Sequence, residues 1–359
     1  MPTVPRIWQP YVMSTCDRTA DRLGRPLGVL RLSLTARCNL SCTYCCPADD
    51  EPNHRLTVQH QIAVIRAACR LGLQSLRLTG GEPLLSNQLE PLLQAISQAR
   101  ADPRDPLARL REVALTSNGV LLSRERAKAL RQSGLDRITV SLDAASGEAF
   151  VRMAGLPVAS THLFERVLAG LQAAIDAGFD PRLGELKINS VIQRHHNEDQ
   201  LIPLARLARG HGIELRLIEF MDVGHRNHWH QDHVITAAEM IDQLRQHWSL
   251  EPLGRAVGST ANRWRFSDGH GQVATIASIS EPFCGDCNRL RVAADGRAFS
   301  CLFASEGRDL RPWLQPQLNE DGLTHAMHDL WLARDDRYSE ERGRLSQEQR
   351  RQEMAYLGG

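Results

Sequence analysis

Cysteine is the residue type in this 359-residue chain whose spacing points most directly to chemistry. There are nine cysteines, and Cys38, Cys42 and Cys45 form a CxxxCxxC pattern. An odd number of cysteines with one tight group indicates metal or thiol chemistry, not a set of structural disulfides. Three thiolates on one short loop can bind three irons of a 4Fe–4S cluster and leave the fourth iron open. The spacing therefore predicts a cluster that can bind a small molecule, and the alternatives are a zinc knuckle or incidental cysteines.

A second group of three cysteines lies near the C-terminus, at Cys284, Cys287 and Cys301. A zinc ribbon would need a fourth ligand at a regular spacing, and none is present, although the sequence alone leaves His270 open as that ligand. Three thiolates again predict a cluster with one vacant iron, here able to accept a nitrogen or oxygen atom of a substrate.

Basic side chains accompany the second cysteine group. Arg289 and Arg291 start a predicted strand, and the alternation of a strand places both on the same face. Two guanidiniums beside an open cluster favour an anionic, phosphorylated ligand, and the alternative is a solvated strand face. Only two lysines are present, and Lys187 lies in the strand-like run ELKINSVI, where an ammonium could serve a binding site.

A repeated strand and helix pattern must position these side chains. Strands are predicted at 29–35, 75–79, 112–116, 137–142, 185–192 and 214–220. Amphipathic stretches between them predict helices at 57–70, 87–99, 123–132, 163–177 and 199–209. This alternation predicts an α/β fold, an incomplete (β/α)6 barrel of parallel strands. The first cysteine group directly follows the first strand, at the edge where such barrels place their active sites.

The pattern changes after Phe220. A loop at 221–234 and a helix near 236–247 precede four short strands at 262–266, 272–277, 289–294 and 297–301, which predict a small antiparallel layer. The chain is helical and charged from about Glu320 onward. We therefore expect an N-terminal tail (1–28), a partial barrel (29–222) and a C-terminal antiparallel-strand and helical module (223–359) that carries the second cysteine group.

Composition excludes several other classes of protein. The net charge is +1, with 43 basic and 42 acidic residues, which argues against the broad basic face of a duplex-binding protein. No run approaches the roughly 20 apolar residues that cross a bilayer, and the N-terminus lacks the apolar run of a signal peptide. We expect a cytoplasmic protein that binds neither nucleic acid nor a membrane.

The motifs resemble those of the GTP 3′,8-cyclase family, a part of the radical S-adenosylmethionine superfamily that begins molybdenum-cofactor biosynthesis. The resemblance covers about residues 30–302 and the C-terminal glycine pair. It rests on LRLSLTARCNLSCTYCCP, RLTGGEPLL, LTSNG, VSLDA, LKIN, RLIEFMDVG and FCGDCNRLRV. Two departures are Ala36, where aspartate is common, and Cys46, where methionine or leucine is common.

The resemblance implies a role for each matching residue. One 4Fe–4S cluster would be bound by Cys38, Cys42 and Cys45, and a second by Cys284, Cys287 and Cys301. S-adenosylmethionine would be contacted by Tyr44, Gly81, Ser141 and Met221. GTP would be contacted by Arg31, Arg77, Thr116, Lys187, Arg289, Leu290 and Arg291. Catalytic roles would fall to Arg291, Gly358 and Gly359, since the family's tail reaches into the active site.

The resemblance also implies a reaction. A 5′-deoxyadenosyl radical would remove hydrogen from ribose C3′ of GTP, and attack on guanine C8 would give 3′,8-cyclo-7,8-dihydro-GTP in a lyase reaction. Implied partners are a reductant protein of the flavodoxin or ferredoxin type and a downstream cyclic pyranopterin synthase. The sequence does not decide between a monomer and a homodimer.

Two rival functions remain open to the sequence. A radical peptide-modifying enzyme would carry a C-terminal extension with two auxiliary clusters that need about seven cysteines, whereas the C-terminal part of this chain has three. A non-enzymatic zinc or iron–sulfur sensor is the other rival, and metal analysis separates a zinc protein from an enzyme with two clusters: two clusters give about eight irons and eight sulfides per chain, whereas a zinc protein gives stoichiometric zinc.

Overall fold

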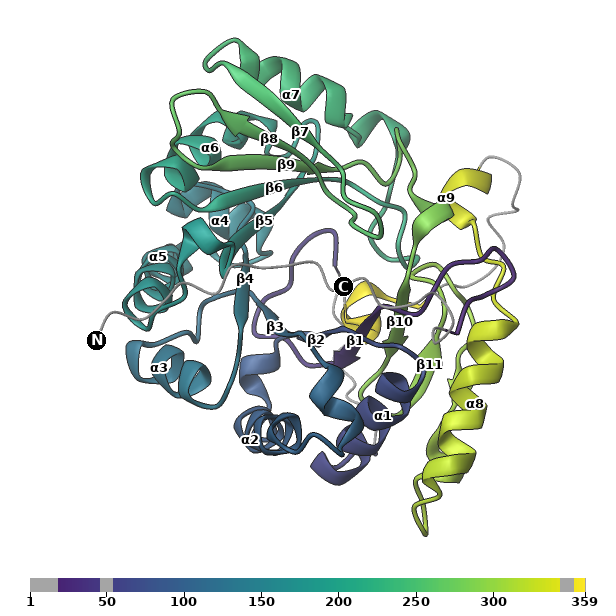
Figure 1. Cartoon of the computed structure of the whole chain (residues 1–359). Coiled ribbons are helices and arrows are strands. Elements are labelled where there is room, and N and C mark those ends of the chain that lie inside the picture. Colours follow the sequence, from purple (N-terminus) through teal and green to yellow (C-terminus); the bar gives the residue numbers. More distant parts are fainter. Residues whose placement is uncertain (1–18, 46–53, 343–351, 359) are drawn as a thin grey trace.

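A single mixed sheet forms the centre of the molecule. The computed structural model describes residues 19–45, 54–342 and 352–358, and Cys16, Cys46 and Gly359 lie outside these residues. Twelve strands lie in the order β12-β11-β10-β1-β2-β3-β4-β5-β6-β9-β8-β7. The sheet curves into an open barrel (Figure 1). Its two edge strands, β12 and β7, do not pair with each other. This is the open α/β barrel that the strand and helix pattern predicts.

The six predicted barrel strands are all present. They are β1 (Val29–Ser33), β2 (Ser75–Thr79), β3 (Glu112–Ser117), β4 (Arg137–Ser141), β5 (Leu186–Ile192) and β6 (Glu214–Glu219). Each pairs in parallel with the next. The helices between them are α1 (Val58–Arg70), α2 (Leu89–Ala101), α3 (Arg124–Gln132), α4 (Gly147–Met153), α5 (His162–Asp176) and α6 (Leu201–Gly210). Only α4 was not predicted, because seven residues are too few to show a helical period.

The C-terminal strands extend this sheet at both edges. The later elements are α7 (Ala237–Arg245), β7 (Leu250–Gly254), β8 (Asn262–Phe266), β9 (Gln272–Ile276), β10 (Arg289–Val292), β11 (Arg297–Phe299), β12 (Arg308–Asp309), α8 (Glu320–Leu332), α9 (Tyr338–Glu341) and α10 (Met354–Leu357). The predicted antiparallel pairs exist, but β9 pairs in parallel with β6, and β10 with β1. They therefore form no separate layer. The parallel run becomes eight strands long, from β10 through β1–β6 to β9.

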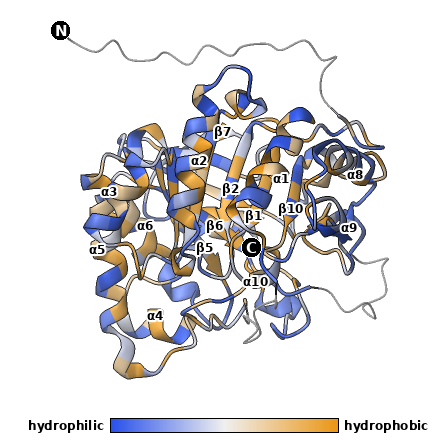
Figure 2. Cartoon of the chain, turned by 90° about the horizontal axis from the view of Figure 1, so that it is seen from below, coloured by the Kyte–Doolittle hydropathy of each residue, from blue (hydrophilic) through white to orange (hydrophobic). Residues whose placement is uncertain are grey.

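The apolar core lies between the sheet and its outer helices. Leu30 and Leu32 point outward from β1 and are fully buried, whereas Arg31 between them points to the barrel interior. Helix α1 begins after Thr57, whose hydroxyl accepts the His60 N–H, and it buries Cys69 as the sequence predicts. Figure 2 shows hydrophobic residues on the strands and on the helix sides that face them. In the described part of the chain, no helix is both long and apolar enough to span a membrane.

Candidate active site

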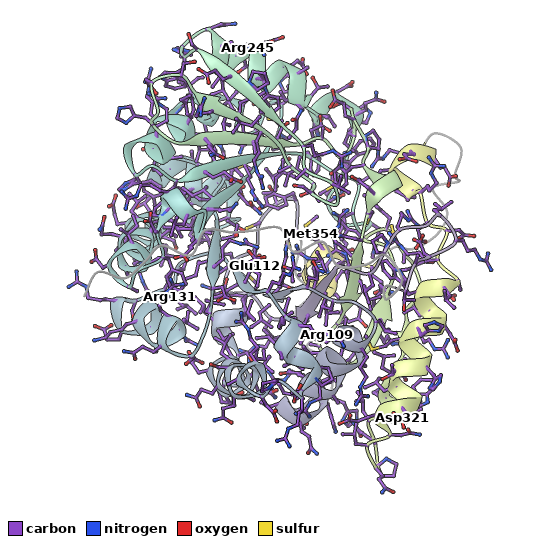
Figure 3. All side chains as sticks on the ribbon, viewed as in Figure 1. Arg109, Glu112, Arg131, Arg245, Asp321 and Met354 are labelled. Carbon is purple, nitrogen blue, oxygen red and sulfur yellow. The ribbon has the colours of Figure 1, made fainter. Side chains whose placement is uncertain are left out.

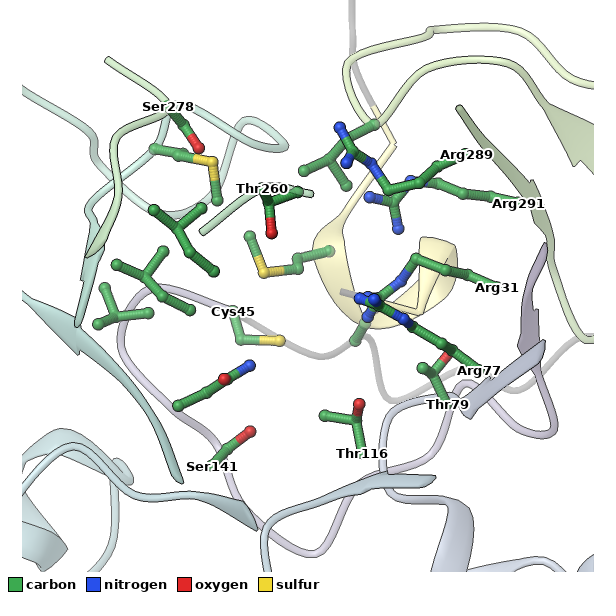
Figure 4. Close-up of a pocket in the computed structure, with 18 of the residues that line it drawn as sticks. Arg31, Cys45, Arg77, Thr79, Thr116, Ser141, Thr260, Ser278, Arg289 and Arg291 are labelled. Carbon is green, nitrogen blue, oxygen red and sulfur yellow. The ribbon is translucent and has the colours of Figure 1, made fainter. Parts of the chain in front are cut away.

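Both cysteine groups line one cavity inside the barrel. Each of their six side chains is a free thiol of intermediate exposure. The first group lies on the loop after β1, and the second lies on either side of β10 and β11. Because β10 pairs directly with β1, two groups about 240 residues apart in sequence meet at one site. Figure 4 shows this cavity, with Cys45 on one side and four arginines on the other.

The loop that carries the first group is held by the glycines after β2. Gly81 N–H donates to the Thr35 carbonyl at 2.7 Å, and Glu82 N–H donates to the Arg37 carbonyl at 2.8 Å. A Cβ atom on Gly81 would lie 2.3 Å from the Arg37 carbonyl oxygen, so only glycine permits this approach. The segment Gly80–Pro83 thus supports the backbone just before Cys38.

Glu82 joins the ends of β2 and β3 below the site. Its fully buried carboxylate accepts the Asn118 N–H at 2.7 Å, the Ser117 hydroxyl at 2.9 Å and the Leu84 N–H at 2.9 Å. Burial raises its pKa to about 7 against the lowering effect of these hydrogen bonds. Asn118 also donates to Asn39 at 2.8 Å, which links β3 to the cysteine loop.

Asp143 holds the other end of the cysteine loop. The Tyr44 hydroxyl donates to its carboxylate at 2.7 Å, and the Val191 N–H donates to the second oxygen at 2.8 Å. Burial raises the pKa of Asp143 to about 6. Tyr44 is therefore fixed between Cys42 and Cys45 by a residue that follows β4.

The second cysteine group has two cationic neighbours. Arg289 donates to Sγ of Cys287 at 3.0 Å, and Arg334 donates to the same sulfur at 3.1 Å. Burial raises the pKa of Cys287, but Arg289 and Arg334 outweigh it and lower the value to about 7. Burial raises the pKa of Cys301 to about 12. The two guanidiniums thus make the thiolate of Cys287 easier to form than that of an ordinary cysteine.

Four arginines project into the cavity from neighbouring strands. The register places Arg31 of β1 between Arg291 of β10 and Arg77 of β2, and Arg289 lies two residues before Arg291 (Figure 4). Burial together with Arg291 and Arg77 holds the pKa of Arg31 well below its usual range. Burial and Arg137 lower the pKa of Arg77 to about 9. Such repulsion between buried cations is relieved when an anion binds among them.

The C-terminal segment enters the same cavity. Met354 and Ala355 of α10 line it, and Met354 lies near the middle of the barrel (Figure 3). The Gly358 carbonyl accepts from Arg31 Nε at 2.9 Å and from Arg291 Nη1 at 3.5 Å. Gly359, also predicted for the site, lies outside the described residues.

Most of the predicted cofactor and substrate residues line this one cavity. They are Arg31, Tyr44, Arg77, Gly81, Thr116, Ser141, Met221, Arg289 and Arg291. Two others do not line it. Leu290 points outward into the apolar core, and the Lys187 ammonium lies 3.0 Å from the Glu214 carboxylate. Their contact with substrate stays a prediction.

Several further cavity residues escaped the sequence prediction. Arg216 lines the cavity and forms an ion pair with Glu214 at 2.5 Å. A charged residue inside the apolar run of β6 is the signal that could have revealed it. Asp143 and Arg334 also line the cavity. No local motif marks Arg334, because folding alone brings it to the cysteines.

The cysteine arrangement does not suit a single metal ion. Among residues 19–45, 54–342 and 352–358, no group of three or more His, Cys, Asp or Glu side chains could hold one. Zinc gathers its ligands around one point, whereas each thiolate of a 4Fe–4S cluster binds a different iron. His270 is exposed and is not among the residues that line the cavity. The thiols therefore fit clusters better than zinc.

Family models match most of the chain. Residues 32–208 match the radical SAM superfamily, and residues 213–340 match the family described as Molybdenum Cofactor Synthesis C.

Curated relatives cover nearly the whole length. A GTP 3′,8-cyclase from Synechococcus is 61% identical over 350 residues, which are 97% of this chain and 100% of the relative. Another, from Xanthomonas campestris pv. campestris, is 45% identical and covers 94% of this chain and 97% of its own.

Solved structures agree on the fold. SuiB of Streptococcus suis, crystallised with S-adenosylmethionine, has a TM-score of 0.58 at 14% identity and covers 93% of this chain and 78% of its own. At this identity the likeness concerns the fold alone.

Proposed function

The chain belongs to the GTP 3′,8-cyclase family, and from this premise we propose that it cyclises GTP to 3′,8-cyclo-7,8-dihydro-GTP. This reaction is the first step of molybdenum-cofactor biosynthesis. One observation carries the proposal: two groups of free thiols and six arginines line a single cavity. The thiols provide a place for redox-active clusters, and the arginines provide a place for a triphosphate.

The thiols are the proposed cluster ligands. Cys38, Cys42 and Cys45 would hold the 4Fe–4S cluster that a radical S-adenosylmethionine enzyme requires, and we propose a second cluster on the Cys284 group. The fit rests on the free state, partial exposure and common orientation of these thiols. When bound, the cofactors supply the 5′-deoxyadenosyl radical that removes the C3′ hydrogen and so allows the bond to guanine C8 to form.

The cavity arginines would bind and orient the substrate. Arg31, Arg77 and Arg291 lie side by side at one level of the sheet, so their guanidiniums can neutralise several phosphate oxygens together. Arg289 lies beside them on β10, and Arg216 lines the cavity from β6. Binding at this depth also excludes water from the reacting atoms.

The loops and the tail would complete the site. We propose that Tyr44, Gly81, Ser141 and Met221 contact S-adenosylmethionine, because these four line the part of the cavity nearest the first cysteine loop and the ends of β2, β4 and β6. The Gly358 carbonyl accepts from Arg31 and Arg291 and so fixes the direction of both guanidiniums. Arg291 is the proposed catalytic residue among them.

The proposed partners follow from the family. Each turnover needs a reductant, for which a flavodoxin- or ferredoxin-type protein is suited, and the product would pass to a cyclic pyranopterin synthase. The barrel (29–222) would start the chemistry, and the C-terminal region (223–359) would hold the second cluster and the substrate.

Anaerobic reconstitution tests the proposal. With GTP, S-adenosylmethionine and dithionite, the protein should form the cyclised nucleotide and 5′-deoxyadenosine in step. Two clusters require about eight irons and eight sulfides per chain. Formation of 5′-deoxyadenosine that does not depend on GTP would refute the substrate assignment, and stoichiometric zinc would refute the clusters.

A further inference from the structure

A buried network of charges joins residues near the N-terminus to the segment that follows α8. The Asp21 carboxylate accepts from Arg25 Nε at 2.6 Å and from Arg334 Nη1 at 3.1 Å. All three side chains are at most 1% exposed. Two guanidiniums thus share one fully buried carboxylate. The next acidic group, Asp336, lies 3.6 Å from Arg334 Nε and is 31% exposed.

Both guanidiniums point at the second cysteine group. Arg25 donates to the Cys284 carbonyl at 2.8 Å. Arg334 donates to the Cys287 carbonyl at 2.6 Å and, through its other terminal nitrogen, to Sγ of Cys287 at 3.1 Å. The network therefore directs guanidinium N–H groups at the site of the proposed second cluster, and Arg334 alone of this pair reaches a sulfur.

The position of Arg334 is fixed from several sides. Its guanidinium lies 4.7 Å from the centre of the Trp331 ring, and the Trp331 indole N–H donates to the Arg25 carbonyl at 3.1 Å. Asp21 accepts from one terminal nitrogen of Arg334, and Cys287 accepts from both through its carbonyl and its sulfur. A buried ion pair adds little stability by itself, so stability alone does not explain this arrangement.

Arg289 donates to the same sulfur but differs from Arg334 in one respect. Arg289 lies on β10 two residues before Arg291 and is also predicted to contact GTP, so its loss would affect substrate binding as well as the sulfur. Arg334 is held by protein groups alone. Its effect on Cys287 is therefore permanent.

We propose that Arg334 is a positioning residue that sets the reduction potential of a 4Fe–4S cluster bound by Cys284, Cys287 and Cys301. The inference rests on the proposed second cluster. Reduction adds one electron, supplied by an external reductant, and no bond forms or breaks. The N–H···S bond and the buried positive charge stabilise the extra negative charge, so they raise the potential.

The test isolates the second cluster in the full-length chain. Substituting Cys38, Cys42 and Cys45 by alanine leaves only the second group, and this reference protein should bind about four irons after anaerobic reconstitution. Redox titration monitored by electron paramagnetic resonance then gives the midpoint potential. Arg334→Gln should shift the midpoint potential to a more negative value. Arg334→Lys keeps the positive charge but loses the paired N–H donors of the guanidinium, so it should shift the midpoint potential less.

Arg22 offers a matched control from the same N-terminal segment. It pairs with Asp335 at the surface, where both side chains are more than 60% exposed, so Arg22→Gln should leave the potential unchanged. An unchanged potential in Arg334→Gln with a full complement of iron would overturn the proposal.

Two further outcomes are also decisive. If Arg334→Gln loses its iron, the potential of Arg334→Lys decides: a more negative value supports the role, and an unchanged value refutes it. If the reference protein itself binds no iron, both the proposed second cluster and this inference are refuted. If it binds iron but Arg334→Gln does not shift the midpoint potential, only the proposed role of Arg334 is refuted.

Discussion

Gly358 offers a sharp perturbation of the site by one methyl group. Its φ of 69° is in the left-handed region that alanine enters only with strain. An added Cβ would lie 2.1 Å from Oγ1 of Thr79, a residue that is itself 1% exposed. Gly358→Ala must therefore move the tail, and its carbonyl would leave Arg31 and Arg291.

The structure gives the size of this effect. Left-handed backbone costs alanine about 1–2 kcal/mol, and forcing a methyl into a packed site costs about 1–3 kcal/mol. A sum of at least about 2 kcal/mol lowers the ratio of docked to undocked tail about 30-fold. We expect turnover to fall by up to about 30-fold as the docked tail is lost. Thermal stability should change little, because the added Cβ meets Thr79 and Ser33 on the inner side of the barrel and the terminal segment can move away from them.

The assay is single-turnover formation of the cyclised nucleotide by anaerobically reconstituted protein. Gly210→Ala is the control, since that glycine ends α6, has no positive φ and would place a Cβ in open space. If the steric clash with Thr79 causes the loss of turnover, then adding Thr79→Ala to the Gly358→Ala protein should recover part of the rate. Wild-type turnover in Gly358→Ala would refute the role of the docked tail.

Two further predictions concern charges in the cavity. Arg77→Met should raise the KM for GTP about 10- to 100-fold, which corresponds to the loss of one charged hydrogen bond. The same substitution should stabilise the apoprotein against urea, since burial and Arg137 already lower the pKa of Arg77 to about 9. An unchanged KM would contradict the assignment of Arg77 to the GTP site. Asp143 has a folded pKa raised to about 6 from 3.8, so its contribution to stability is present below about pH 4 and is lost as the pH rises through 6. In urea titrations the wild-type apoprotein should therefore lose roughly 3 kcal/mol of unfolding free energy between pH 4 and pH 6. Asp143→Asn should not show this loss. Equal losses in the two proteins would show that Asp143 is not the responsible group.

The barrel could be predicted because its strands and helices alternate with different periods. The outward residues of β1, such as Leu30 and Leu32, and the amphipathic face of α1 give clear patterns. The partners of the C-terminal strands could not be predicted in the same way. Alternation shows that a segment is a strand, but not that β10 joins β1 or that β9 joins β6.

The site was predictable where it is local in sequence. The two cysteine groups and Arg289 with Arg291 lie in short motifs, and the resemblance added Arg31 and Arg77. Arg334 could not be found, because its contact with Cys287 spans 47 positions and depends on the docking of α8. Lys187 shows the opposite case, since a rare lysine in a strand forms an ion pair with Glu214 outside the cavity lining.

The central claim is that this cavity holds GTP so that its ribose C3′ loses hydrogen. GTP carrying deuterium at C3′ tests it directly in the anaerobic reaction with S-adenosylmethionine and dithionite. The account predicts one deuterium in the 5′-deoxyadenosine, formed in step with the cyclised nucleotide. Unlabelled 5′-deoxyadenosine with the deuterium retained in the nucleotide would contradict it.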